Sequence, residues 1–173
     1  LIRSKLSCTS ESVYARKCVV REVPSKESGE FLDNTHIFGK SVSKHRLGLY
    51  YENELVALML CNKPRLGIGK NQEGHELVRF SSTKRVVGGA SKLLKYFITQ
   101  YAPSEIYSFS DNSFSAGNLY RVLGFDIDVE YGPGYWYCNP KDLIIHHRFK
   151  FRKSNLKKCG FDIELHTERE IME

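Results

Sequence analysis

The sequence predicts an α+β fold, a mixed and mostly antiparallel sheet flanked by helices. Residues 46–51 and 54–61 are apolar runs on either side of Glu52-Asn53, which is typical of an antiparallel hairpin. Residues 76–80 predict a further strand that passes through a glycine-containing turn into an amphipathic helix. Another strand, a polar loop and a short helix follow at 106–123. Together these elements predict one sheet with helices packed on it.

The other elements are expected in chain order. Residues 18–23 alternate as a first strand, and Ser25 opens a short helix that runs through Leu32. The strand 54–61 is almost wholly apolar, so we expect it to be central and buried on both faces. A glycine-rich loop is expected at 64–74, and Gly124 is expected to close the helix 118–123 in a left-handed conformation. Strands at 126–131, 135–138 and 143–151 would complete the sheet.

The bulk composition is that of a soluble globular protein. A chain of 173 residues with 41% apolar residues can bury one real core, and two full domains would be cramped. No apolar run approaches the roughly 18 residues that suggest a membrane span, and no secretory signal opens the chain. The five cysteines are scattered without a CxxC pair, which favours reduced thiols in a cytosolic setting.

The net charge of +6 is concentrated near the C-terminus. Between Lys141 and Gly160 there are seven Lys/Arg and one acid, Asp142. Cations interleaved with aromatic residues suit a phosphate backbone, so we expect double-stranded DNA as a partner. The expected contacts are Arg16, Lys17, His147, Arg148, Lys150, Arg152, Lys153, Lys157 and Lys158. The alternative is a solvated strand face whose alternate residues, Phe149 and Phe151, simply point into the core. Trp136 has the same two interpretations, base stacking or core packing.

Three segments are expected. Residues 1–17 would be a basic arm or linker end, 18–153 the folded domain, and 154–173 a basic extension that leads into a further helix. Thr167 and Glu170 have the spacing of a capping box at the start of that helix. Because a capped helix seldom ends within about a turn, we expect the chain to be a piece of a longer protein.

The turn at 85–90 is a candidate phosphate site. Glycines between a strand and a helix let backbone amides approach a ligand, and a helix N-terminus favours negative charge. We expect a pyrophosphate as the ligand of this turn. The expected contacts are Arg85, Val87, Gly88, Gly89 and Ala90. The alternative is a tight turn without a ligand.

This region resembles the GNAT (Gcn5-related N-acetyltransferase) family. Arg85, Gly88 and Ala90 match the Arg/Gln-x-x-Gly-x-Gly/Ala loop that holds the pyrophosphate of coenzyme A in that family. The later segment that packs beside the pantetheine is matched by Asn118, Leu119, Tyr120, Gly124 and Phe125. The resemblance implies a GNAT-like fold, acetyl-CoA or another acyl-CoA as ligand, and Tyr120 as general acid for the departing thiolate.

Nearly the whole chain is similar to the C-terminal region of phage-encoded homing endonucleases of the Vsr-like (EDxHD) kind. The similarity lies in runs such as His36–Gly39, Leu47–Tyr51, Glu76–Phe80, Gly117–Tyr120 and His147–Lys153. It implies a phage protein that acts in the bacterial cytoplasm, with any nuclease activity in a preceding domain.

The same skeleton is similar to the Mom family of phage DNA-modifying enzymes, which have a GNAT fold and alter adenine in DNA. The resemblance implies His36, Arg79, Asp111 and Tyr120 as catalytic residues. Ile37 stands where Mom has an aromatic residue, and Arg121-Val122 replaces Gln-Ala.

The roles of these residues stay open at the level of the sequence. His36 is a candidate base or metal ligand, or merely a helix cap, and Asp111 is a candidate amine or metal ligand, or an Asx turn. Arg79 lies in an apolar strand and must pair, with Asp111 as one candidate partner. We expect a DNA-acting GNAT-fold domain that binds or modifies DNA. The alternative is an acyl-CoA-dependent N-acyltransferase, and a third possibility is a structural domain that has lost both ligands.

Overall fold

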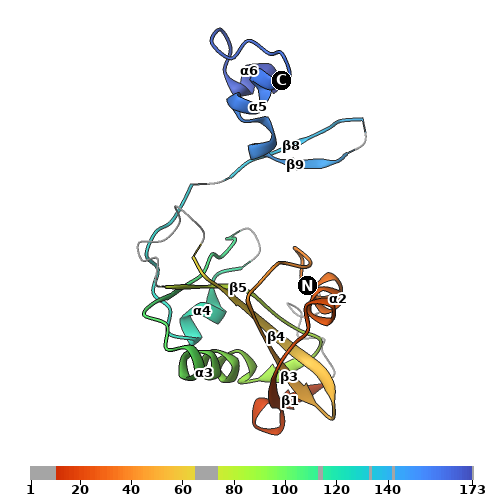
Figure 1. Ribbon diagram of the computed structural model, residues 1–173, viewed down its shortest axis with the longest axis vertical. Coiled ribbons are helices and arrows are strands. Elements are labelled where there is room, and N and C mark those ends of the chain that lie inside the picture. Colours follow the sequence, from red (N-terminus) through yellow and green to blue (C-terminus); the bar gives the residue numbers. More distant parts are fainter. Residues whose placement is uncertain (1–10, 65–73, 113–114, 133, 142, 173) are drawn as a thin grey trace. The chain divides into compact units, whose positions relative to one another are not determined.

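The computed structural model describes residues 11–64, 74–112, 115–132, 134–141 and 143–172 (Figure 1). The chain divides into two compact units, unit 1 (Leu1–Asp126) and unit 2 (Ile127–Glu173). This division lies before the last strands. The sequence had suggested a boundary after residue 153. Most of the expected loop 64–74 and residues 1–10 of the expected arm lie outside the described residues.

Unit 1 contains a five-stranded sheet with the order β2-β3-β4-β5-β7. Its strands are β2 (Val19–Glu22), β3 (His45–Tyr51), β4 (Glu54–Asn62), β5 (His75–Ser82) and β7 (Ile106–Tyr107). Neighbours are antiparallel from β2 to β5, whereas β5 and β7 are parallel. The expected mixed, mostly antiparallel sheet is thus confirmed.

The hairpin between β3 and β4 forms where the sequence predicts it. Glu52 and Asn53 both have positive φ, 50° and 67°, which a two-residue turn of type I′ requires. Every residue of β4 from Leu55 to Cys61 is buried, in agreement with its apolar sequence.

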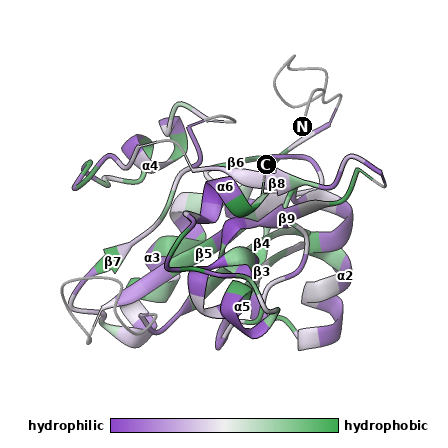
Figure 2. Ribbon diagram, turned by 90° about the horizontal axis from the view of Figure 1, so that it is seen from above, coloured by the Kyte–Doolittle hydropathy of each residue, from purple (hydrophilic) through white to green (hydrophobic). Residues whose placement is uncertain are grey.

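Two apolar clusters cover the two faces of the sheet. Helix α3 (Gly89–Tyr101) contributes Leu93, Leu94 and Phe97 to one cluster, and Figure 2 shows both hydrophobic and hydrophilic residues along it. Helix α2 (Ser25–Thr35) contributes Leu32 to the other cluster, against Leu58 and Leu60 of β4. Burying each such side chain stabilises the fold by about 1.5–3 kcal/mol.

The segment expected as a basic arm is folded where it is described. Strand β1 (Ser12–Tyr14) runs parallel to β6 (Arg85–Val87), and a 3-10 helix, η1 (Ala15–Lys17), follows β1. Ala15 is buried and Val13 packs against the α3-side cluster. One small and one β-branched apolar residue were too weak a signal to predict this pairing.

Unit 1 ends with helix α4 (Asn118–Val122), and Gly124 has a φ of 83°, so the expected left-handed closure is confirmed. Residues 126–131, expected as a strand, are not in one.

Unit 2 contains a two-stranded antiparallel sheet of β8 (Trp136–Cys138) and β9 (Ile145–His147). A 3-10 helix, η2 (Arg148–Phe151), and helices α5 (Lys153–Lys158) and α6 (Glu168–Met172) follow. Of the predicted strand 143–151, Ile145–His147 is confirmed and the rest is wrong. The expectation that this strand completes the main sheet is also wrong, since β8 and β9 form a separate sheet. The side chain of His147 accepts a hydrogen bond from the Phe149 amide, which caps the 3-10 turn, and Phe149 is 52% exposed instead of facing a core.

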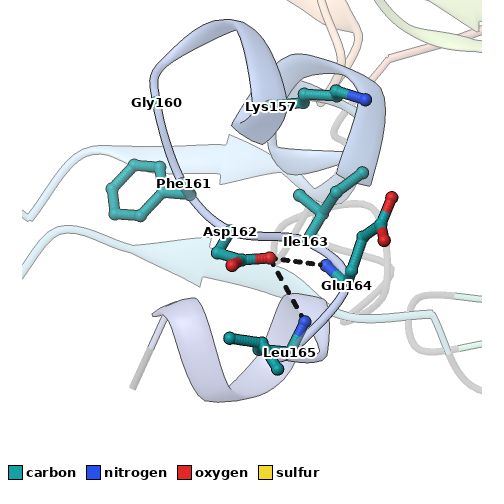
Figure 3. A pocket seen from close by; sticks show the side chains of 7 residues that line it. All are labelled: Lys157, Gly160, Phe161, Asp162, Ile163, Glu164 and Leu165. Carbon is teal, nitrogen blue, oxygen red and sulfur yellow. Dashed lines mark hydrogen bonds between the residues drawn. The ribbon is translucent and has the colours of Figure 1, made fainter.

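Local hydrogen bonds shape the end of unit 2. The capping box is confirmed, since Thr167 N donates to Glu170 Oε2 over 2.7 Å and Glu170 N donates to Thr167 Oγ1 over 3.3 Å. Before it, Asp162 Oδ1 accepts from the amides of Glu164 and Leu165, which bends the loop around a shallow hollow (Figure 3). Among the described residues, no helix has the length and apolar character to cross a membrane.

Candidate functional site

The glycine turn lies between β6 and α3, as the sequence predicts. Gly88 has a φ of 75°, which glycine adopts without strain. A Cβ on Gly89 would lie 3.0 Å from Val86 Cγ1 and 3.4 Å from Leu49 Cδ1, so the turn packs closely on the sheet. No side chain caps α3. Because the first amides of a helix have no partner within it, the turn can donate hydrogen bonds to an anion.

Basic side chains accompany this turn. Arg85 is exposed in β6, and Arg16 and Lys17 are exposed in η1. The η1 segment lies beside the turn, since a Cβ on Gly88 would come 3.8 Å from Ala15 Cβ. Arg16 and Lys17, expected to contact DNA from a free arm, thus belong to the surroundings of the glycine turn.

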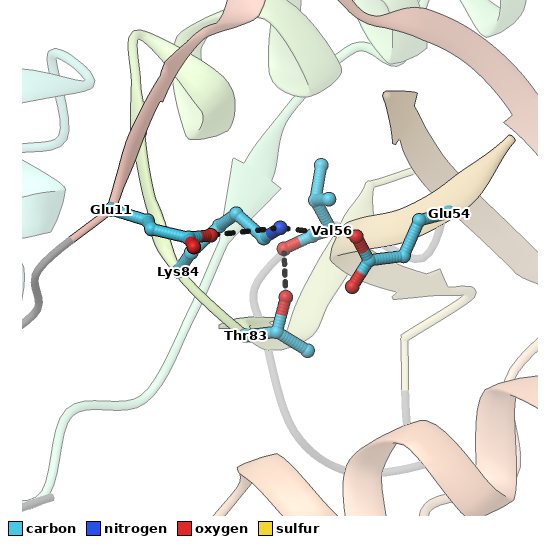
Figure 4. Close-up of polar contacts among 5 residues, drawn as sticks. All are labelled: Glu11, Glu54, Val56, Thr83 and Lys84. Carbon is cyan, nitrogen blue, oxygen red and sulfur yellow. Dashed lines mark hydrogen bonds and ion pairs between the residues drawn. The ribbon is translucent and has the colours of Figure 1, made fainter. Parts of the chain in front are cut away.

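Two lysines that the sequence analysis did not single out connect the elements around the glycine turn. Lys92 Nζ donates to the carbonyls of Ala15 and Cys18 over 2.9 and 2.6 Å, which ties α3 to η1. Lys84 Nζ lies 3.0 Å from Glu54 Oε2 and 3.5 Å from Glu11 Oε2 (Figure 4). The hydrogen bond to Glu54 is the largest cause of the raised pKa of Lys84. No sequence signal distinguishes these lysines from the other cations of the chain.

Tyr120 lies where β7 leaves β5. The register pairs β7 with His75 and Glu76 alone, whereas β5 continues to Ser82. Just beyond β7, Ser108 Oγ lies 2.8 Å from the Leu77 carbonyl and 3.1 Å from the Tyr120 hydroxyl. Ser108 has one proton, so when it donates to Leu77 the Tyr120 hydroxyl donates to Ser108 or to the Phe109 carbonyl, 3.5 Å away.

The Tyr120 ring is fixed by packing. It meets Phe125 edge-on with ring centroids 5.6 Å apart, and both rings pack against the cluster that contains Ala90 and Leu93 of α3. Asn118, the first residue of α4, is exposed. The glycine turn and Tyr120 thus share one apolar cluster.

His36 and Arg79 lie together on the α2 side of the sheet. His36 caps the end of α2, and its Nδ1 accepts a hydrogen bond from the Phe38 amide over 3.1 Å. The Arg79 guanidinium lies 5.5 Å from the Phe38 ring centroid and donates to the Val78 carbonyl. Burial, and then the nearby charge of Arg79, lower the pKa of His36, so its imidazole is neutral near pH 7. A neutral His36 whose Nδ1 accepts a hydrogen bond carries its proton on Nε2.

Asp111 is exposed in the loop after β7, where its carbonyl accepts from the Ser115 amide. Its pairing with Arg79 stays a prediction. Among the described residues, no group of three His, Cys, Asp or Glu side chains is arranged to hold a metal ion.

The other expected nucleic-acid contacts lie in unit 2, on β9, η2 and α5 and at Arg152 between η2 and α5. All of these side chains are exposed: His147, Arg148, Lys150, Arg152, Lys153, Lys157 and Lys158. The glycine turn, the Tyr120 hydroxyl and the His36–Arg79 pair all lie in unit 1. The structure therefore divides the expected site residues between the two units.

Comparison with known proteins gives a fold and no family. No family model matches the chain, and no curated protein matches it. An integron cassette protein, VCH_CASS6, from the mobile metagenome of V. cholerae is similar, with a TM-score of 0.53 and 9% identity over 84% of this chain and 99% of that one. An aminoglycoside acetyltransferase, meta-AAC0020, from an uncultured soil metagenomic sample has a TM-score of 0.47 and 12% identity over 72% of this chain and 98% of that one. The first likeness concerns the fold alone, and the second is too distant to carry an argument.

Proposed function

We propose that unit 1 has a GNAT-type fold and transfers an acyl group from coenzyme A to an amine. The observation that carries this proposal is the position of the Tyr120 hydroxyl, beside Ser108 at the point where β7 leaves β5. The GNAT resemblance rests on a strand, a glycine turn, a helix, a second strand and a second helix in that order. The chain has β5, Gly88, α3, β7 and α4 in the same order.

Each residue would have a defined task. The uncapped amides of α3, with Arg85 and Arg16 nearby, would bind the pyrophosphate. The thioester would lie along β5, where the acceptor nitrogen attacks its carbonyl carbon and the carbon–sulfur bond breaks. Tyr120 would give its proton to the departing thiolate, and the proton lost by the nitrogen would pass to solvent.

Binding of acetyl-CoA tests the first part of this proposal. We expect millimolar acetyl-CoA to raise the melting temperature of the chain, because a ligand that binds only the folded state stabilises it. Arg85→Ala should reduce the shift, whereas Lys95→Ala, which removes an exposed cation further along α3, should leave it unchanged. The proposal fails if acetyl-CoA produces no shift, or if the two variants behave alike.

Tyr120→Phe separates chemistry from binding. The variant keeps the ring that packs on Phe125 but removes the acidic proton, so acetyl-CoA should still bind while kcat falls. Equal kcat in the variant and the parent would exclude Tyr120 as the general acid.

We also propose a second function, in which the chain is part of a phage homing endonuclease-like protein and acts on DNA. The exposed cations of η2 and α5, with Arg152 between these two helices, support it. The proximity of His36 and Arg79 supports its Mom-like form, in which DNA is the acceptor and these two residues act with Asp111 and Tyr120.

Two experiments test the second function. Duplex binding should weaken steeply as salt rises, and the triple reversal Arg148→Glu, Lys150→Glu and Arg152→Glu should abolish it. Mass spectrometry of nucleosides from DNA incubated with the chain and acetyl-CoA should show a modified adenine. Binding that the triple reversal leaves intact would contradict the DNA proposal, and unmodified adenine would contradict its Mom-like form.

A further inference from the structure

Unit 2 displays a cluster of exposed rings, Trp136, His147 and Phe149, which we call the ring cluster. Trp136 and His147 are direct partners across β8 and β9, with ring centroids 4.6 Å apart. The His147 and Phe149 rings are also 4.6 Å apart. Trp136 is 57% exposed and Phe149 is 52% exposed, although rings of this size gain most by burial.

Arginine side chains stack on this cluster. The Arg152 guanidinium lies 5.0 Å from the Phe149 ring centroid, and that of Arg148 lies 5.6 Å from Phe149 and 5.1 Å from Tyr135. A guanidinium held over a ring is a planar cation, on which a nucleobase can itself stack. The segment 148–158 contains six Lys/Arg and no acid. The acid nearest to these rings in the hydrogen bonds of unit 2 is Glu168, whose Oε1 accepts from the Tyr135 hydroxyl over 3.3 Å.

Backbone contacts hold the ring cluster in place. His147 Nδ1 accepts from the Phe149 amide over 3.2 Å, and Asn155 Nδ2 donates to the carbonyls of Phe149 and Lys150 over 3.2 and 3.1 Å. Leu156 of α5 is buried. A partner would therefore meet rings whose backbone is already ordered, which lowers the entropic cost of binding.

We propose that unit 2 binds single-stranded nucleic acid through the ring cluster. Unpaired bases would stack on Trp136 and on the Arg152–Phe149 layer, while Lys150, Lys153 and Lys157 would meet phosphates. The bases of a duplex are already stacked on one another, so their faces are closed to exposed rings. The inference rests on the second proposed function, which it deepens by naming the form of nucleic acid, and it does not depend on acyl transfer.

Trp136 makes the inference directly measurable, because it is the chain's one tryptophan. We expect titration with a twelve-residue oligothymidine to quench the tryptophan emission of the full chain to saturation. The matched duplex should quench it little at equal salt. Quenching by stacking is local, so contacts of phosphate with lysine alone would not produce it.

Variants measured by anisotropy of a labelled oligothymidine complete the test. Trp136→Ala should weaken binding by roughly 5- to 150-fold, the range for one base–aromatic stack, whereas Trp136→Phe should retain most of the affinity. Lys150→Ala removes one of the expected phosphate contacts and should reduce the slope of log K against log salt by about 0.7. Lys141→Ala removes an exposed cation outside the segment 148–158 and should leave that slope unchanged.

The outcomes separate this inference from the proposed functions. Equal affinity for duplex and single strand without quenching would overturn stacking but leave phosphate-mediated DNA binding standing. Absence of binding to either form would overturn both. Neither result bears on acetyl-CoA binding by unit 1, which is measured separately. Full affinity in Trp136→Ala would also overturn the inference, whatever the oligonucleotide does to the parent.

Discussion

Units 1 and 2 keep their structures by different means. In unit 1, strands β3, β4 and β5 and helices α2 and α3 fill two buried apolar clusters. In unit 2, Leu156 is the one buried apolar side chain among the described residues. Polar contacts take the place of a large core in unit 2. One is the Thr167–Glu170 capping box, and another is the hydrogen bond that the Tyr137 hydroxyl donates to Glu168 over 3.2 Å.

This difference separates two kinds of functional surface. A packed core can hold a hydroxyl such as that of Tyr120 in a fixed position, which chemistry requires. A unit with little core leaves its aromatic rings at the surface, where a partner can cover them. We therefore propose that transfer chemistry takes place in unit 1 and recognition of nucleic acid in unit 2.

The largest expected effect is the loss of a core ring in unit 1. Phe97 is fully buried, so Phe97→Ala should cost about 3–5 kcal/mol of unfolding free energy, and Leu156→Ala about 2 kcal/mol. Amide hydrogen exchange should become faster in β3 and β4 in the Phe97→Ala variant. In the Leu156→Ala variant it should become faster only in unit 2. Tyr96→Ala, on an exposed position of the same helix, is the control. Faster exchange in both units in either variant would contradict the division of the chain into two compact units.

The glycine turn should be sensitive to backbone conformation. Gly88→Ala places a Cβ on a residue with a φ of 75°, which should cost about 1–2 kcal/mol in urea unfolding. Gly132→Ala is the matched control in unit 2, since Gly132 has no positive φ and no atom lies within 4 Å of its added Cβ. Equal stability of the two variants would show that the turn does not need its glycine.

Acid should destabilise unit 1 through two histidines, His45, which is buried, and His75, which is half-buried. Burial, as the largest cause, lowers the pKa values of His45 and His75 below their ordinary value of 6.5. At His45 the charges of His75, Lys44 and Arg46 act in the same direction, and that of Glu22 opposes them. At His75 the charges of Lys63 and Lys44 act in the same direction. The unfolded chain then binds protons first, so stability should be full above pH 6.5 and fall as the pH drops toward the lowered values. His75→Gln should flatten this fall in thermal melts, and an unchanged slope would contradict the assignment.

The smallest expected effect concerns the end of unit 2. Thr167→Ala removes the cap of α6 and should cost about 1 kcal/mol, measured as faster amide exchange in that helix. The backbone and then the side-chain hydrogen bond of Thr167 lower the pKa of Glu170 below 4.5, so the effect should shrink in acid. Ser154→Ala in α5 should change nothing; if it matches Thr167→Ala, the cap is not what orders α6.

The sequence predicted unit 1 well because its signals are strong and local. The apolar run of β4, the Glu52-Asn53 turn and Gly124 each have a direct physical meaning, and all three are confirmed. The β1–β6 pairing was missed because three-residue strands carry little periodicity.

Unit 2 was predicted less well. The alternation of cations and rings at 148–151 fits a strand equally well, but the His147 cap turns the chain into a 3-10 helix. At the site, the motif located the glycine turn and Tyr120. Lys92 and Ser108 act through backbone carbonyls distant in sequence, which no local pattern reveals.

The most direct test of the assignment of acyl transfer to unit 1 is amide hydrogen exchange of the chain with and without acetyl-CoA. We predict protection at residues 89–91, the first amides of α3, and around Tyr120, with no change in unit 2. Protection confined to unit 2, or no protection at the glycine turn at millimolar acetyl-CoA, would contradict the assignment of acyl transfer to unit 1.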